Sequence, residues 1–450
     1  MKKLLSSIAL AISLPLAAQD TPKNIIMVVS DGMGPVYTTA YRYYADDPKT
    51  PEIESTIFDK YYIGSSSTFP AKVSGLVTDS AASATALASG VKSYNGAIGV
   101  DVNKQPVKSV LHKAKSLGYK TGLVVTSQIN HATPASYMVH NESRHNYDQI
   151  ADSFYQEKTN GQFNADLMLG GGWTYFIRDD RNLVEEFKSS GFHYLDSFEQ
   201  LASLPKDKPV LGLFDKKGLA NAIDHDDKHR LATMTDAALK HLSDDNGMFL
   251  LVEASQVDWG GHSNDIAWSM AEMDDLAKTM AILETYVAQN PDTLVILTAD
   301  HSTGGVSIGA NGKYAWEPTW LKNMTASSDK IAEDIANEGI DATRITTQLG
   351  FNIESEEIDT LTTAVDKAKA DWLENKDKYQ ARGYTENSTV KRSVYKAVNK
   401  ILDKRSNTGW TTSGHTGVDV PVYAFGKQSE LFKGNIDNTD IAKKIFSLIK

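Results

Sequence analysis

The chain has 450 residues, contains no cysteine and carries a formal net charge of −11. Its length suits a large α/β domain with an inserted subdomain. The negative charge disfavours nucleic acid as a partner, and a chain without cysteine has neither disulfides nor a lipid anchor on cysteine.

The start of the chain has the pattern of an export signal. Two lysines precede an apolar stretch from Leu4 to Leu16, and Ala17 and Ala18 come before the expected cleavage point. The stretch is too short to span a bilayer comfortably, and no later segment is apolar for long enough. We therefore predict a cleaved signal peptide over 1–18, a mature protein over 19–450, a periplasmic or secreted location, and no stable membrane insertion.

Short apolar runs separated by helical patterns predict an α/β fold. The runs expected to be buried parallel strands are Ile25–Val29, Thr121–Val125, Phe249–Val252, Leu294–Leu297 and Val420–Phe425. Val107–Leu117 and Leu231–Leu242 have the apolar spacing of helices. This alternation predicts a central, mostly parallel sheet flanked by helices on both faces.

Polar side chains follow three of the predicted strands. Asp31 follows the first strand, Glu253 follows the third, and Asp300 and His301 follow the fourth. Open α/β sheets bind ligands at the carboxyl ends of their parallel strands. A single acid at such a position is more often a helix cap, but three strands that deliver acids and a histidine to one edge favour a site.

Residues 327–404 carry helical periodicity and almost no strand signal. The apolar stripes consist of Ile358, Leu361 and Val365, and of Val390, Val394, Val398 and Ile401. We predict an inserted helical subdomain that begins after His301 and ends shortly before His415. Our hypothesis is a lid or dimer contact beside the site; the alternative is a self-contained helical bundle that pads one side.

Ser80 begins an alanine-rich segment that predicts a helix, with Asp79 or Ser80 as its N-cap. A serine at a helix N-terminus faces unpaired N–H groups and the positive end of the helix dipole. That position binds phosphate and lowers the cost of an alkoxide. Taken alone, however, the motif favours an ordinary capping serine.

Three further motifs supply candidate metal ligands. Asp258 and His262 are four residues apart, so one helical turn points both at one ion, and this pair suits zinc. A lone pair of this kind is usually a surface feature. Asp300 and His301 are adjacent, so binding one metal requires a bend, which the glycines that follow allow. His415 lies between glycines just before the last predicted strand.

Together these residues suffice for two zinc ions and a third, oxygen-rich site. Two metals about 4 Å apart can clamp the attacking and leaving oxygens of a phosphoryl transfer. The residues are Asp31, Ser80, Glu253, Asp258, His262, Asp300, His301 and His415.

The arrangement resembles the alkaline phosphatase family from Asn24 to the end of the chain, apart from 327–404. The serine motif distinguishes this family from related sulfatases and phosphodiesterases better than the metal ligands do. The matching segments are Ser30–Gly32, Val77–Thr85, Ala132–Ala135, Ser143–Arg144, Glu253–His262, Thr298–His301 and Gly414–Gly417.

The resemblance implies two zinc ions bound by carboxylates and imidazoles. The ligands of the first are Asp258, His262 and His415; those of the second are Asp31, Asp300 and His301, with Ser80 as its catalytic ligand. It also implies one magnesium ion per chain near Asp31, Thr133 and Glu253. Arg144 would hold two phosphate oxygens with its planar fork.

Two residues depart from the pattern of some family members. His131 stands where some members have an aspartate at the magnesium site, so zinc is possible there. Trp259 stands where some have a lysine that reaches phosphate.

The function implied by the resemblance is hydrolysis of small phosphate monoesters to an alcohol and inorganic phosphate. The implied mechanism proceeds through a covalent phosphoserine at Ser80, and the implied assembly is a homodimer. The alternatives are a phosphodiesterase or sulfatase on the same metal scaffold, and a scavenger of metal or phosphate. The presence of Ser80 argues against the scavenger, because binding alone requires no nucleophile.

Overall fold

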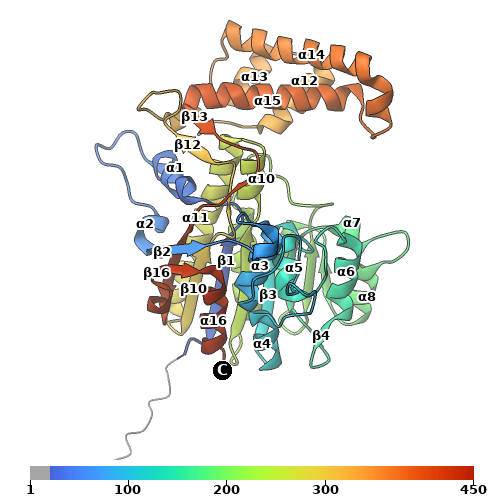
Figure 1. Ribbon diagram of the computed structural model, residues 1–450, viewed down its shortest axis with the longest axis vertical. Helices are drawn as coiled ribbons and strands as arrows, with labels where there is room; N and C mark the ends of the chain where they lie inside the picture. The colour runs from blue at the N-terminus through green and yellow to red at the C-terminus, as the bar shows by residue number, and fades with distance from the viewer. Residues whose placement is uncertain (1–20) are drawn as a thin grey trace, which may run out of the picture.

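The computed structural model describes residues 21–450, so the predicted signal peptide over 1–18 lies outside the described residues. A ten-stranded sheet runs through the molecule, and helices pack against both of its faces (Figure 1). The strand order is β16-β2-β15-β10-β1-β9-β3-β6-β8-β7.

The four central strands are parallel and fully covered. They are β10 (Thr293–Thr298), β1 (Asn24–Ser30), β9 (Met248–Ala254) and β3 (Lys120–Gln128). Every residue of β1 is buried: Ile26 and Val28 pack in the core on one face, whereas Met27 and Val29 pack in the core on the other. This two-sided burial explains why the strand reads as a continuous apolar run.

The remaining strands extend the sheet on both sides. Beyond β3 lie β6 (Leu167–Gly171), β8 (Val210–Leu213) and β7 (His193–Leu195), and beyond β10 lie β15 (Val420–Gly426), β2 (Tyr62–Ser67) and β16 (Gly434–Asp437). Three short pairs lie outside this sheet: β4 (Lys158–Thr159) with β5 (Gln162–Phe163), β11 (Ser302–Thr303) with β14 (His415–Thr416), and β12 (Val306–Ile308) with β13 (Thr408–Trp410).

The direction predicted for Val420–Phe425 is wrong, because β15 runs antiparallel to β10. The strand β14 pairs with β11 just beyond the carboxyl end of β10. The chain therefore enters β15 from the edge at which the parallel strands end, and it must run back. An apolar run indicates burial but does not indicate direction.

Helices cover the two faces of the sheet. The predicted helices are observed as α4 (Val110–Ser116) and α9 (Arg230–Leu242). The core on one face includes residues of α1 (Pro35–Ala45), α2 (Ile57–Tyr61), α9, α10 (Gln256–His262) and α11 (Ile266–Gln289). The core on the other includes residues of α3 (Ser80–Ser89), α4, α5 (Ala132–Met138), α6 (Tyr147–Gln156), α7 (Trp173–Phe176), α8 (Leu183–Ser189) and α16 (Asn438–Leu448).

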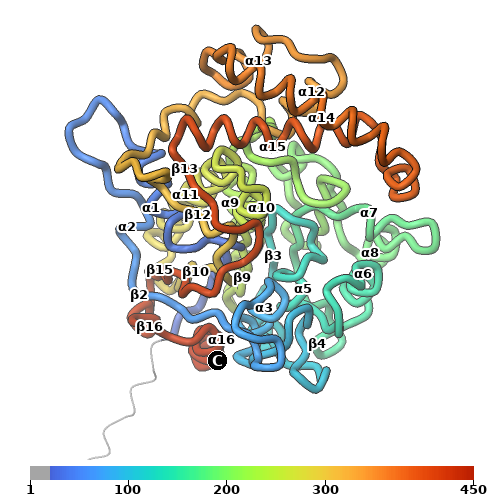
Figure 2. The backbone as a smooth tube through the Cα atoms, turned by 45° about the horizontal axis from the view of Figure 1, so that its top comes forward, coloured from blue at the N-terminus to red at the C-terminus, as the bar shows by residue number. Residues whose placement is uncertain are grey.

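Residues 327–404 are helical and lie beyond one edge of the α/β body, next to α10 and β13 (Figures 1 and 2). The helices are α12 (Ser328–Glu338), α13 (Ala342–Leu349), α14 (Ser355–Gln380) and α15 (Glu386–Ser406). Val394 and Val398 of the predicted stripe are buried. Tyr395 donates a hydrogen bond to Asp265 (3.2 Å), and Asn399 donates one to the Ser263 carbonyl (3.1 Å). These bonds join α15 to the turn after α10.

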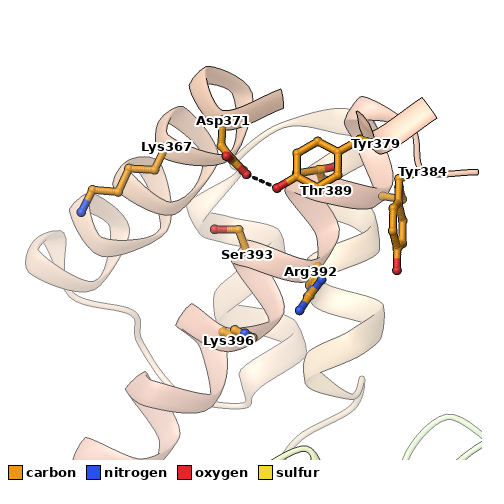
Figure 3. A pocket seen from close by; sticks show the side chains of 10 residues that line it. Lys367, Asp371, Tyr379, Tyr384, Thr389, Arg392, Ser393 and Lys396 are labelled. Carbon is orange, nitrogen blue, oxygen red and sulfur yellow. Dashed lines mark hydrogen bonds between the residues drawn. The ribbon is translucent and has the colours of Figure 1, made fainter. Parts of the chain in front are cut away.

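A cavity of about 380 Å³ lies between α14 and α15 (Figure 3). Its lining includes Lys367, Tyr384 and Arg392, and the Tyr379 hydroxyl donates a hydrogen bond to Asp371 (2.5 Å). None of the predicted site residues lines this cavity. In the described part of the chain, none of the helices has both the length and the apolar character that a membrane span requires.

Candidate active site

The carboxyl edge of the central strands brings the predicted acids together. Asp31 follows β1 directly, Glu253 is the second-last residue of β9, and Asp300 follows β10 by two residues. All three side chains are completely buried. In parallel register, Val29 of β1 lies opposite Glu253, so these carboxylates share one end of the sheet.

Ser80 is the first residue of α3, and Asp79 is the residue that caps the helix. The Asp79 carboxylate accepts a hydrogen bond from the Ala82 N–H (3.0 Å). The Ser80 hydroxyl therefore has no capping role, and its Oγ lies 3.1 Å from His301 Nε2. A serine released from capping at a helix start has the placement that a nucleophile requires.

The first group of ligands consists of Asp258, His262 and His415, whose candidate atoms lie within 4.8 Å of one another. His262 Nδ1 lies 2.6 Å from the Ser413 carbonyl, and His415 Nδ1 lies 2.8 Å from the Thr78 carbonyl. A carbonyl only accepts hydrogen bonds, so each Nδ1 carries the proton.

In the neutral form of these two rings, the Nε2 atoms of His262 and His415 carry lone pairs that face each other across 3.1 Å. Asp258 Oδ2 lies 3.4 Å from His262 Nε2, which adds another electron-rich atom. A cation between these atoms removes the repulsion, and two imidazoles with a carboxylate suit zinc.

The second group is centred on His301. Its Nε2 lies 3.2 Å from Asp300 Oδ2 and 3.4 Å from Asp31 Oδ1. The adjacent residues Asp300 and His301 thus reach one point, as the predicted bend requires. Asp258 also lies within 4.8 Å of Asp31 and His301, so its carboxylate borders both groups.

The third group consists of Asp31, His131 and Glu253. Asp31 Oδ1 and Oδ2, His131 Nδ1 and Glu253 Oε1 are buried and have no hydrogen-bond partner among residues 21–450. The Thr133 hydroxyl is also buried and has no hydrogen-bond partner among these residues. Because isolated buried polar atoms are costly, their convergence fits a bound cation.

Burial and crowding of these groups shift their pKa values. Burial and neighbouring carboxylates raise the pKa of Asp31 well above its ordinary value. Burial also raises the pKa of Asp300, and it raises the pKa of Glu253 to about 8. Burial lowers the pKa of His131 to about 3 and that of His301 well below its ordinary value. The imidazoles of His131 and His301 are therefore in the neutral form that binds metal, and the three carboxylates require cations to remain charged together.

Arg144 lies between Asp79 and the third group. Its Nη1 donates to Asp79 Oδ2 (3.0 Å), and its Nη2 lies 3.3 Å from His131 Nε2. Asp79 thus caps α3 and orients the arginine. The Trp259 ring meets the His131 ring edge-on, with centroids 6.0 Å apart.

Two residues that were not predicted from the sequence form hydrogen bonds with the candidate ligands. The Thr303 hydroxyl donates to Asp258 Oδ1 (2.5 Å) and lies 3.2 Å from His301 Nδ1, so it links the first two groups. The Ser127 hydroxyl donates to Glu253 Oε2 (3.3 Å). The contact with Asp258 joins β11 to α10, and the contact with Glu253 joins β3 to β9, so no local motif signals them.

Comparisons with known proteins agree with this geometry. The family model described as alkaline phosphatase matches residues 22–450. Alkaline phosphatase 3 of Bacillus subtilis is 44% identical over 434 residues, covering 96% of this chain and 90% of that protein. The repressible alkaline phosphatase of Saccharomyces cerevisiae is 32% identical over 490 residues, covering 95% of this chain and 81% of that protein.

Among solved structures, a cold-active alkaline phosphatase from the psychrophile Shewanella sp. aligns with a TM-score of 0.86 and 46% identity, covering 95% of this chain and 100% of that one. The topology of the sheet, the position of the ligand groups and the similarity to these relatives all indicate the same family. The chain belongs to the alkaline phosphatase family and is a metal-dependent phosphoric monoester hydrolase.

Proposed function

We propose that this enzyme hydrolyses phosphate monoesters through a covalent phosphoserine at Ser80. The observation that carries the proposal is the position of the Ser80 hydroxyl, which is free of capping and lies 3.1 Å from His301 Nε2. The surrounding side chains of Asp31, Asp300 and His301 are buried and converge on the same end of the sheet.

Three metal ions per chain are proposed. The ligands of the first zinc are Asp258, His262 and His415; those of the second are Asp31, Asp300 and His301; and the third ion lies among Asp31, His131, Thr133 and Glu253. Bound zinc ions would supply Lewis-acid charge that lowers the pKa of the serine hydroxyl and stabilises the leaving oxygen.

The third ion is magnesium or zinc. Oxygen ligands favour magnesium, whereas the His131 nitrogen favours zinc. Histidine-to-glutamate and histidine-to-aspartate variants of the alkaline phosphatase from the Antarctic bacterium TAB5, which is 26% identical, are described with magnesium bound in their M3 site. We infer that His131 biases this site toward zinc.

The residues of this chain perform the transfer in two steps. Ser80 Oγ gives its proton to solvent, attacks phosphorus and forms a phosphoserine, the ester P–O bond breaks, and the leaving oxygen gains a proton from water to give the alcohol. Water then attacks the same phosphorus, the Ser80–phosphorus bond breaks, and Ser80 recovers its proton as inorganic phosphate leaves. Arg144, oriented by Asp79, holds two phosphate oxygens in both steps.

The proposal extends to export and assembly. The pattern of residues 1–18 supports a cleaved signal and a periplasmic or secreted location. Residues 327–404 form an inserted subdomain on an α/β domain over 19–450, and we propose that the enzyme is a homodimer.

Trapping the intermediate tests the proposed nucleophile. Wild-type enzyme is mixed with a radiolabelled monoester, quenched in acid and digested, and the labelled peptide is sequenced. We expect label on Ser80 and none in Ser80→Ala, whose metal content stays close to wild type while turnover falls by roughly 10³-fold or more.

Ser83 lies one turn later on α3 and serves as the control for the position of the label. Its hydroxyl donates a hydrogen bond to the Asp300 carbonyl, so we expect no label on it. Label on Ser83, or near-normal turnover in Ser80→Ala, would exclude the proposed nucleophile.

A further inference from the structure

Five large apolar side chains are exposed on two segments, one that precedes Ser80 and one that follows His415, and these segments meet at Val77 and Gly417. We name this set the apolar rim: Phe69, Val73, Leu76, Val77 and Val418. Leu76 is 78% exposed and Val73 is 76% exposed. Single exposed apolar residues are ordinary, but a cluster in a chain with a net charge of −11 indicates a contact surface.

The segment that carries most of the rim is held firmly by Asn95. The Asn95 N–H donates to Ser74 Oγ (2.9 Å), and its side-chain amide donates to the Val77 carbonyl (3.1 Å). Its side-chain oxygen accepts from the Asp79 N–H (3.1 Å). The apolar side chains are therefore presented to solvent by an ordered segment.

The rim adjoins the catalytic groups on their open side. The Thr78 carbonyl contacts His415 Nδ1 (2.8 Å), and a Cβ placed on Gly417 would lie 3.4 Å from Val77 Cγ2. The His262 side chain is 41% exposed, whereas the His301 side chain has no exposure. Figure 2 shows the segment after β13 crossing toward the start of α3.

A monoester whose phosphorus lies at Ser80 therefore extends its alcohol past His262 and His415. We propose that the apolar rim, through Leu76, Val77 and Val418, contacts this leaving group and makes the enzyme prefer monoesters of alcohols with an apolar chain or ring. This inference rests on the proposed function and names the substrate class of that site.

The size of the effect follows from the geometry of the rim. A surface buries only one side of a ligand chain, and full burial of a methylene would raise affinity about fourfold. One-sided contact gives about a twofold rise in kcat/KM per methylene, or about 30-fold from methyl to hexyl phosphate. Lengthening an unbranched chain hardly changes the leaving-group pKa, so the series isolates contact from chemistry.

The test measures kcat/KM for methyl, propyl and hexyl phosphate by phosphate release, with wild type and with the double variant Leu76→Ser, Val77→Ser. We expect the hexyl-to-methyl ratio to fall at least about fivefold in the double variant. Val77→Ile should keep the ratio. Leu117→Ser, which replaces a leucine that is 49% exposed at the end of α4, is the matched surface control.

The outcomes separate the two proposals. If the wild-type hexyl-to-methyl ratio of kcat/KM is close to one and methyl phosphate is still cleaved, the inference about the apolar rim is wrong. The proposed function is then unaffected. No cleavage of any monoester overturns the proposed function. Light scattering adds a third result: if the double variant changes the mass in solution and leaves the ratio unaltered, the rim is a contact between two copies of the chain, and the leaving-group inference is wrong.

Discussion

The two ring nitrogens of His131 differ in their contacts, and this distinguishes it from a buried histidine that has only a structural role. One ring nitrogen lies 3.3 Å from Arg144, and the other has no hydrogen bond within the described chain. A structural histidine uses both nitrogens: His112 lies 3.0 Å from the Met138 carbonyl through Nε2, and its Nδ1 accepts from the Ser109 N–H. The free nitrogen of His131 therefore points to a metal.

Replacing His131 by aspartate, together with Trp259→Lys, should shift the third site toward magnesium. The change removes a nitrogen ligand and adds an oxygen ligand, which magnesium prefers, and the lysine restores a cation near phosphate. Mass spectrometry of the native protein should show more magnesium per chain than in wild type. The single variant Trp259→Lys is the control, and an unchanged magnesium-to-zinc ratio in the double variant would mean that these positions do not select the metal.

At the scale of elements, Asp79 both caps the start of α3 and positions Arg144. One carboxylate oxygen accepts from the Ala82 N–H, and the other accepts from Arg144 and from the Gly96 N–H (2.9 Å). The cap and the arginine therefore use different atoms of one side chain, and substitutions can separate them.

Asp79→Asn should keep the cap and weaken the hold on Arg144, because asparagine caps about as well as aspartate but carries no charge. We expect KM for a phosphate monoester to rise about fivefold with a smaller change in kcat. Asp79→Ala should show the same KM and also lose about 1 kcal/mol of unfolding free energy. Loss of kcat with KM unchanged would contradict a positioning role.

The ends of α5 and α6 are joined by His140 and Glu157, whose Nδ1 and Oε2 lie 2.6 Å apart. Burial lowers the pKa of His140, but the hydrogen bond and charge of Glu157 outweigh it and raise the pKa above 6.5. The folded state thus binds the proton more tightly, so this stabilisation is complete below pH 6.5 and is lost as pH rises through the folded-state pKa.

His140→Gln should therefore destabilise the protein more at pH 6 than at pH 9, by about 1 kcal/mol. Urea unfolding at both values, with zinc in excess, measures the difference. His145→Gln, at a nearby exposed histidine, is the control. Equal destabilisation at the two pH values would show that packing of the ring, and not its charge, stabilises this junction.

For the whole molecule, the sequence predicted the central strands and the edge at which the acidic side chains meet, because both depend on local patterns. Ile25–Val29 is apolar on both faces because two cores cover it, and Asp31 follows because the strand ends there. The direction of β15 depends on the pairing of β11 with β14, which joins segments more than 100 residues apart. The support from Thr303 depends on the contact of β11 with α10, across 45 residues. Single-sequence patterns report neither contact.

The helical region at 327–404 is the subject of our hypothesis of a lid or dimer contact. Its core is continuous with that of the α/β body: Ile331 and Val394 belong to the same buried cluster as Ile266 and Met270 of α11. Asn399 reaches the turn after α10, the helix that carries Asp258 and His262. A lid or dimer contact at this place would influence the site through that turn.

Replacing 327–404 with a short Gly/Ser linker should therefore preserve two zinc ions while changing substrate affinity or oligomeric state. Kinetics, metal analysis and light scattering measure the three quantities. Wild-type kinetics with an unchanged number of chains per assembly would exclude both the lid and the interface, and failure to fold would place the region in the core. Because the shared core makes that failure a real outcome, Asn399→Ala provides a milder version. It removes the 3.1 Å bond to the Ser263 carbonyl and keeps every helix, so a lid role predicts an altered KM in a folded protein.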